Sequence, residues 1–124
     1  MSRRQLGQRW EQRACAFLKS HGVRVLETGY QCRFGEIDLV CVDEQTLVIV
    51  EVRARGGGSV ANALETVDTR KRRKLVRTAR HLLMRRPELS EKPVRFDVIA
   101  IENIDTAQAR LEWIRDAFDA ESAV

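Results

Sequence analysis

The sequence has neither a cysteine pattern for metal binding nor an apolar run that could cross a bilayer. Its three cysteines, Cys15, Cys32 and Cys41, form no Cys-x-x-Cys pair, which argues against a zinc ribbon and a disulfide framework. A membrane-spanning helix needs about 18 consecutive apolar residues, and no run is that long. The opening residues also lack the apolar core of a signal peptide. We therefore expect a cytoplasmic protein with reduced cysteines and no membrane partner.

The chain is also too short for two ordinary domains, at 124 residues. Hydrophobic residues make up 44% of it and charged residues 32%, which is typical of a globular protein with one core. We expect a single domain over residues 1–118 and a frayed tail over residues 119–124. The net charge of +4 is too small to identify a partner, so the distribution of charge along the chain matters more.

Hydrophobic periodicity and turn residues predict two long helices and four or five strands. Three glycines between Arg55 and Ser59 indicate a mobile loop before the second helix. The predicted elements are a helix at Arg3–Ser20, strands at Val23–Tyr30, Glu36–Val42 and Leu47–Arg53, a helix at Thr69–Arg86, and strands at Val94–Glu102 and Leu111–Arg115. This order, α-β-β-β-α-β-β, favours an α/β fold with a mixed sheet flanked by helices. The first three strands should form an antiparallel meander, and the strand after the crossover helix can run parallel to an earlier one.

Acidic and basic side chains gather on the second and third predicted strands. Alternation places Glu36 and Asp38 on one face of the second strand, and Glu51 and Arg53 on one face of the third. If Glu44 and Gln45 form a two-residue turn, the numbers of paired residues add to 89. Asp38 then lies opposite Glu51, and Glu36 lies opposite Arg53. A slip of one residue would separate the pairs.

Two interpretations of these carboxylates remain open. One is a solvated strand face with a Glu36–Arg53 salt bridge. The other is a cation site, because opposed carboxylates destabilise a sheet unless Mg²⁺ or Mn²⁺ relieves their repulsion. The run Leu47–Val50 is apolar on both faces, so the third strand should be buried, and charges at its end need partners or a ligand.

The second long helix carries an unusual excess of positive charge. Between Arg70 and Arg86 the chain has nine Lys or Arg residues and no acid. Like charges four residues apart destabilise a helix, so the excess of Lys and Arg favours an anionic partner. Nucleic acid fits better than a membrane surface, because the apolar stripe of this helix is needed for the core and cannot also enter a membrane. Lys71 lies near the edge of that stripe. The candidate nucleic-acid-binding residues are Arg55, Arg70, Arg73, Lys74, Arg77 and Arg80.

Several of these residues together resemble a known family. Gly35-Glu36-Ile37-Asp38-Leu39-Val40, Val50-Glu51-Val52-Arg53, Lys71 and Arg95-Phe96-Asp97-Val98-Ile99, with Gly7, Glu11 and Ala117-Phe118, resemble the YraN family of uncharacterised bacterial proteins over nearly the whole chain. That family is similar to archaeal Holliday-junction resolvases and to the PD-(D/E)XK nuclease superfamily. The resemblance implies a restriction-endonuclease-like fold.

The resemblance also implies roles for individual residues. Asp38 and Glu51 match the metal-binding acids, and Glu11 matches an acid on the first helix that can join such a site. Lys71 matches a basic residue of the later helix. Arg53 occupies the position where the motif has lysine, and this departure counts against turnover because arginine stays protonated and is a poor proton acceptor.

The leading hypothesis is a nucleic-acid-binding protein, with DNA as the expected partner, that has a Mg²⁺- or Mn²⁺-dependent endonuclease site. Asp38 and Glu51 would hold the ion, Arg53 and Lys71 would stabilise charge on the phosphate, and Glu11 or Glu36 would complete the ligand shell or orient water. The alternatives are a non-catalytic nucleic-acid-binding module with a degenerate site, and an adaptor whose basic helix binds an acidic protein. Resolvase-like enzymes often work as dimers, so a homodimer is a further expectation.

Overall fold

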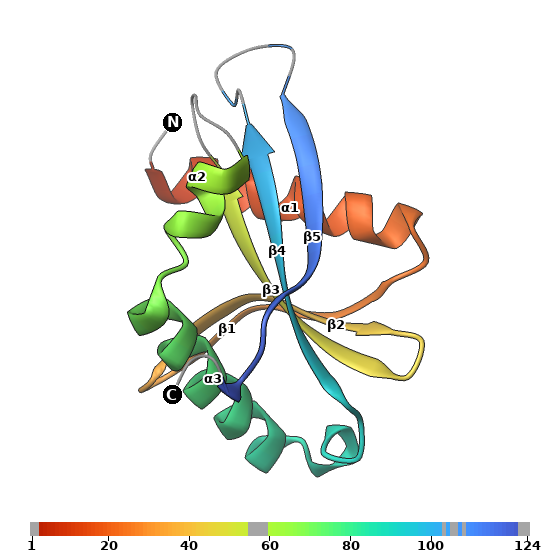
Figure 1. Cartoon of the computed structure of the whole chain (residues 1–124). Coiled ribbons are helices and arrows are strands. Elements are labelled where there is room, and N and C mark those ends of the chain that lie inside the picture. The colour runs from red at the N-terminus through yellow and green to blue at the C-terminus, as the bar shows by residue number, and fades with distance from the viewer. Residues whose placement is uncertain (1–2, 55–59, 103, 105–106, 108, 122–124) are drawn as a thin grey trace.

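A computed structural model of the chain describes residues 3–54, 60–102, 104, 107 and 109–121. Five strands form one sheet in the order β1-β2-β3-β4-β5, and helices lie on both of its faces (Figure 1). The elements are α1 (Arg3–Ser20), β1 (Arg24–Cys32), β2 (Gly35–Asp43), β3 (Thr46–Ala54), α2 (Val60–Glu65), α3 (Thr69–Arg85), a 3₁₀ turn (Pro87–Leu89), β4 (Val94–Glu102) and β5 (Arg110–Phe118). β1, β2 and β3 are antiparallel neighbours, β4 runs parallel to β3, and β5 is antiparallel to β4.

This architecture confirms the predicted mixed sheet flanked by helices, which is the arrangement expected of a restriction-endonuclease-like fold. Two features differ from the prediction. The crossover from β3 to β4 contains the additional short helix α2, and β5 spans nine residues where Leu111–Arg115 was expected. The predicted mobile loop, Arg55–Ser59, lies outside the described residues. Among the helices that the structure describes, none is long and apolar enough to cross a membrane.

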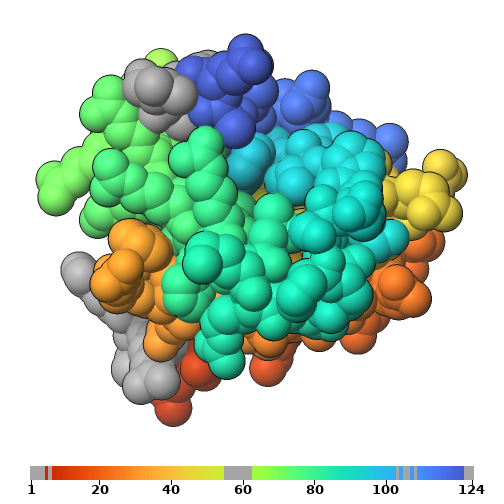
Figure 2. All heavy atoms as spheres, turned by 90° about the horizontal axis from the view of Figure 1, so that it is seen from below, coloured from red at the N-terminus to blue at the C-terminus, as the bar shows by residue number. Residues whose placement is uncertain are grey.

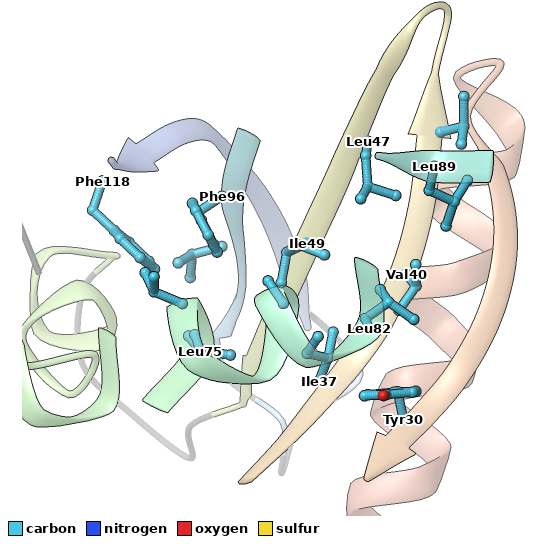
Figure 3. Packing of buried hydrophobic residues seen from close by; sticks show 14 of the residues in the cluster. Tyr30, Ile37, Val40, Leu47, Ile49, Leu75, Leu82, Leu89, Phe96 and Phe118 are labelled. Carbon is cyan, nitrogen blue, oxygen red and sulfur yellow. The ribbon is translucent and has the colours of Figure 1, made fainter. Parts of the chain in front are cut away.

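The sheet separates two hydrophobic cores, one under each long helix. α3 covers one face, where its buried residues Leu75, Val76, Ala79 and Leu82 meet side chains such as Ile49 (Figure 3). α1 covers the other face through Trp10, Ala14 and Leu18, which pack against a core that includes Leu39, Val48 and Val50. The sequence predicted the α3 stripe correctly, and these two layers leave the end of the β2–β3 pair between the helices.

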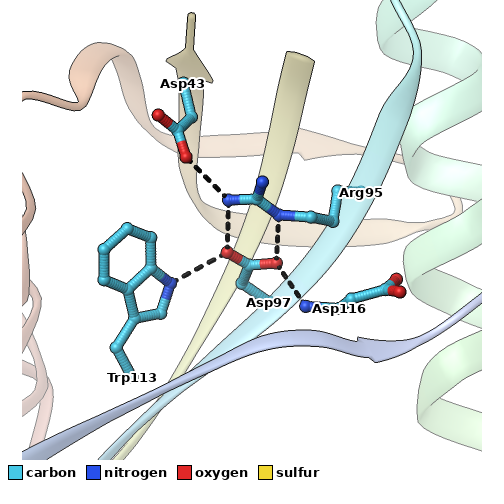
Figure 4. A network of polar contacts seen from close by, with 5 residues as sticks. All are labelled: Asp43, Arg95, Asp97, Trp113 and Asp116. Carbon is cyan, nitrogen blue, oxygen red and sulfur yellow. Dashed lines mark hydrogen bonds and ion pairs between the residues drawn. The ribbon is translucent and has the colours of Figure 1, made fainter.

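A fully buried carboxylate, Asp97, ties β4 to the edge strand β5 (Figure 4). Arg95 donates two hydrogen bonds to it, at 2.9 and 3.0 Å, and also contacts Asp43 at 3.1 Å. The Trp113 indole and the Asp116 backbone amide donate the remaining two, at 2.8 and 2.9 Å. The β4–β5 register shifts at this point, between Phe96 and Val98. Because the carboxylate is fully hydrogen-bonded, we assign the Arg95–Asp97 part of the motif to the stability of the sheet.

The β2–β3 hairpin has the predicted register but ends earlier than expected. Its five pairs run from Asp43–Thr46 to Leu39–Val50, and their numbers add to 89 as predicted. The next expected backbone pairs, Asp38 with Glu51 and Glu36 with Arg53, do not form, so that detail of the prediction was wrong. The Asp38 carboxylate instead accepts a hydrogen bond of 2.8 Å from the Val52 amide. If the two strands had continued to pair, this amide would have donated to a backbone carbonyl of β2.

Candidate functional site

A polar cavity of about 360 Å³ lies where β2 and β3 separate. Two helices on opposite faces of the sheet close it, because α1 reaches it from one face and α3 from the other. It adjoins a larger groove of about 960 Å³ between α1 and β1. The residues that line the cavity are Gly7, Trp10 and Glu11 of α1, Glu36 and Asp38 of β2, Glu51, Val52, Arg53 and Ala54 of β3, and Lys71 of α3.

Asp38 is the central acid of the cavity. Its hydrogen bond from the Val52 amide places the carboxylate between the two diverging strands. From that position its carboxylate acts on the carboxyl groups of both Glu51 and Glu11 and raises their pKa values. The register places Gly29 of β1, which has a left-handed φ of 66°, beside Asp38. The cavity therefore brings together acids from α1, β2 and β3.

Glu51 is the most buried acid of the cavity, with 5% of its surface exposed. Burial, reinforced by the contact with Asp38, raises its pKa to about 9, although Lys71 and Arg53 oppose the rise. Lys71 Nζ lies 3.3 Å from Glu51 Oε2, within the distance of an ion pair. The two groups are not aligned for a hydrogen bond, so Glu51 Oε2 has no hydrogen-bond partner. Burial and the neighbouring acid outweigh this one partner, so the pKa rises despite the ion pair. The carboxyl is held protonated at neutral pH unless further positive charge enters the cavity.

The start of α3 explains why Lys71 reaches Glu51. Asp68 caps this helix, and its side chain accepts a hydrogen bond of 2.9 Å from the Lys71 amide. Lys71 therefore lies in the first helical turn, half-buried against the sheet, while the neighbouring Arg70 is exposed. The predicted position of Lys71 at the edge of the apolar stripe agrees with this placement.

The two outer acids differ in burial. Glu11, which α1 contributes, is half-buried, and its pKa rises to about 7 because of burial, its contact with Asp38 and the charge of Glu36. Glu36 is exposed and accepts a hydrogen bond of 3.2 Å from Gln31 on the neighbouring strand. Among the ion pairs of the described residues, none joins Glu36 to Arg53. The Glu36–Arg53 salt bridge, one of the two interpretations left open by the sequence, does not form among the described residues, and Glu36 instead makes a contact within the β1–β2 hairpin.

The cavity has the chemistry of a cation site. Among the residues that the structure describes, no three His, Cys, Asp or Glu side chains are already arranged to hold a metal ion. Mg²⁺ does not require three, because it binds through one or two carboxylates and retains several waters. Asp38 and Glu51 supply two adjacent carboxyls, and the raised pKa values of Glu51 and Glu11 show that the nearby positive charge of Lys71 and Arg53 does not offset burial and the neighbouring acids. The residues therefore fit a hard divalent cation.

The exposed side of α3 forms a basic face beside this cavity. Every candidate binding residue on α3 is exposed, and the green and teal spheres of this helix and the following segment dominate Figure 2. The basic face begins next to the acids, because Lys74 lies against Gly35, the residue before Glu36. Arg55, the remaining candidate, falls outside the described residues. The members of the basic face are Arg70, Arg73, Lys74, Arg77 and Arg80.

Comparison with known proteins gives the family. The model of the uncharacterised protein family UPF0102 matches residues 10–101. A UPF0102 protein of Alcanivorax borkumensis is 43% identical over 97% of this chain and 96% of its own length. Relatives from Pseudomonas aeruginosa and Nitrosococcus oceani are 41% and 40% identical, each over 96% of this chain, and over 96% and 95% of their own lengths. The chain belongs to this family. The matched range covers the cavity residues from Trp10 to Lys71, and the names of these relatives state no activity.

The sequence gives no signal that Trp10 lies in the cavity wall, because its spacing on α1 is that of a packing residue. That spacing agrees with the structure, since Trp10 does belong to the core under α1. The role of the Val52 amide was also missed, because strand patterns predict side-chain faces and not where a ladder stops. The one available signal was the predicted repulsion between Asp38 and Glu51, which favours separation of the strands at that point.

Proposed function

We propose that this protein binds nucleic acid, with DNA as the expected substrate, and hydrolyses a phosphodiester bond at a divalent cation held by Asp38 and Glu51. One observation carries the proposal. The buried Glu51 carboxyl and the half-buried Asp38 carboxyl share a cavity with Lys71 and Arg53, at the beginning of an exposed basic face. Carboxyls whose charge Lys71 does not fully offset attract a further cation, and the surrounding basic groups suit the anionic phosphate that a cation would bind.

The residues of the cavity divide the work of hydrolysis among them. Asp38 and Glu51 would hold Mg²⁺ or Mn²⁺, and the ion would supply Lewis-acid polarisation of the scissile phosphate and acidify the attacking water. Lys71 and Arg53 stabilise negative charge that develops on the phosphate oxygens. Glu11 has a pKa of about 7, so it can exchange a proton with water near neutral pH and is better suited than the exposed Glu36 to act on the attacking water.

The basic face of α3 supplies affinity for the nucleic acid. Its exposed Lys and Arg side chains lie on one helix, and the sequence of this helix contains no acid that would neutralise them. Contacts of this kind neutralise backbone phosphates irrespective of base sequence, and they weaken as salt increases. The groove of about 960 Å³ beside the cavity offers space for a strand that leaves the site.

A second candidate function is nucleic-acid binding without turnover, and Arg53 favours it. Its guanidinium stays protonated and cannot accept a proton, whereas lysine at this position can lose one when its pKa is shifted. An inactive descendant of a nuclease would retain the fold and the basic face. It would bind nucleic acid with the same dependence on salt.

Cleavage and binding by Asp38→Ala distinguish the two candidates. With an enzyme, Mg²⁺-dependent cleavage of labelled DNA is lost in this variant, while binding measured in chelator stays within about twofold of the wild type. Glu112→Gln, an exposed change on β5, serves as the matched control and should cleave normally. Binding without cleavage by the wild type supports the second candidate, and absence of binding contradicts both.

A further inference from the structure

Three buried polar atoms without a hydrogen-bond partner belong to residues of the same cavity. They are Trp10 Nε1, Glu51 Oε2 and Arg53 Nε, and no other buried side-chain nitrogen or oxygen in the described part of the chain lacks a partner. Native proteins pair almost all such atoms, so an unpaired group needs an explanation, such as a ligand or ion. The concentration of all three in one cavity wall indicates a ligand with both a positive centre and hydrogen-bond acceptors.

Glu51 Oε2 is an acceptor and suits the cation already proposed, but the other two atoms are donors. The indole N–H of Trp10 and the Nε–H of Arg53 can only donate, so they require an acceptor. Two further guanidinium groups, those of Arg9 and Arg13, lie 5.7 and 5.6 Å from the centre of the Trp10 ring. These two groups do not line the cavity, but the cavity wall itself contains two unpaired donors and Lys71, a combination that favours an anionic oxygen.

The other tryptophan shows how this protein ordinarily treats an indole N–H. Trp113 Nε1 donates to the buried carboxylate of Asp97 at 2.8 Å and contributes to a complete network (Figure 4). Trp10 is a buried core residue with 4% of its surface exposed, yet its indole N–H has no such partner. Packing alone would be equally well served by phenylalanine, which carries no donor.

We propose that Trp10 Nε1 and Arg53 Nε bind a non-bridging oxygen of the phosphodiester in the cavity that Asp38 and Glu51 also line. This inference rests on the proposed function, and it makes Trp10 a substrate-binding residue contributed by α1. Both donor atoms are buried within residues that line the cavity, so the half-buried Arg53 side chain has to shift when the phosphate enters. The oxygen thereby gains two donors that have no other partner in the protein.

Nuclear magnetic resonance tests this directly, because the chain has only two tryptophans and hence two indole N–H signals. Trp10→Phe and Trp113→Phe assign them. The probe is a thymidine dinucleotide with one phosphodiester group, added in the presence of Mg²⁺. We expect the Trp10 signal to move downfield on titration while the Trp113 signal stays in place. The uncharged methylphosphonate analogue should produce a much smaller shift.

An affinity measurement provides the second arm. Trp10→Phe removes only the donor and should weaken dinucleotide binding about tenfold, the effect of one hydrogen bond to a charged acceptor. Trp113→Phe should lower thermal stability without changing affinity. If the dinucleotide shifts backbone signals around Asp38 while the Trp10 indole signal and the Trp10→Phe affinity are unchanged, the inference is wrong and the proposed function stands. If the dinucleotide produces no shift anywhere at the cavity, both are wrong.

Discussion

Replacement of Glu51 by glutamine should stabilise the protein in the absence of metal ions. The folded state raises the pKa of this carboxyl from 4.5 to about 9, so the group must take up a proton on folding at neutral pH. The cost is about 1.4 kcal/mol for each pH unit above 4.5, which gives roughly 3 kcal/mol at pH 7. Glutamine fills the same space without that cost. Because Lys71 loses an ionisable partner, we expect a net gain of about 1–3 kcal/mol in the free energy of unfolding.

The sign of the pH dependence follows from the raised pKa. The stability contributed by protonated Glu51 is fully present below pH 4.5 and is lost as the pH rises towards 9. Wild type and Glu51→Gln should therefore be nearly equal at pH 4.5 and diverge steadily up to pH 9. Glu11, whose pKa is about 7, adds a smaller loss of wild-type stability over the lower part of this range.

Urea denaturation at pH 5, 7 and 9 in chelator measures the effect, with the exposed-site variant Glu112→Gln as control. The control should follow the wild type at each pH. If Glu51→Gln is less stable than the wild type at pH 7 and 9, Glu51 is ionised and serves as a structural partner of Lys71. That result would refute the argument that the positive charge of Lys71 and Arg53 does not offset burial and the neighbouring acids.

Three other predictions concern the remaining parts of the molecule. Reversal of Arg73, Arg77 and Arg80 to glutamate should abolish most DNA binding and flatten its salt dependence in fluorescence anisotropy, with the circular-dichroism spectrum unchanged; unaltered affinity would place the interface elsewhere. Arg53→Lys should raise the single-turnover cleavage rate at saturating DNA, and an unchanged zero rate would favour the non-catalytic candidate. Asp97→Asn should lower the free energy of unfolding by about 3 kcal/mol in urea, because Arg95 keeps a largely buried charge with a weaker partner; a loss below about 1 kcal/mol would contradict the stabilising role of the network.

Local patterns were sufficient to predict the elements that form the site. The apolar stripe of α3, the register of the β2–β3 hairpin and the proximity of Asp38 to Glu51 all follow from periodicity and a two-residue turn. These features depend on residues close in sequence, where geometry leaves few choices.

The rest of the site depends on contacts between distant segments. The separation of the strands at Asp38 results from a side chain that takes a backbone amide, which a pattern of apolar and polar residues does not encode. The approach of Glu11 to Asp38 requires α1 to cross the sheet on the opposite face from α3. The length of β5 depends on a register shift stabilised by the Asp97 network. Each of these arrangements is set by tertiary packing, so sequence reasoning found the participants and missed the geometry.

Binding of Mn²⁺ to the intact protein tests whether Asp38 and Glu51 form a cation site. Electron paramagnetic resonance of free Mn²⁺ counts bound ions without requiring any substrate. The account predicts saturable binding to the wild type that strengthens between pH 6 and 9, as Glu11 and Glu51 release protons. Binding should be lost in Asp38→Asn and unchanged in Glu112→Gln. Equal binding by wild type and Asp38→Asn, or no saturable binding by the wild type at pH 9, would contradict the assignment of a cation site to this cavity.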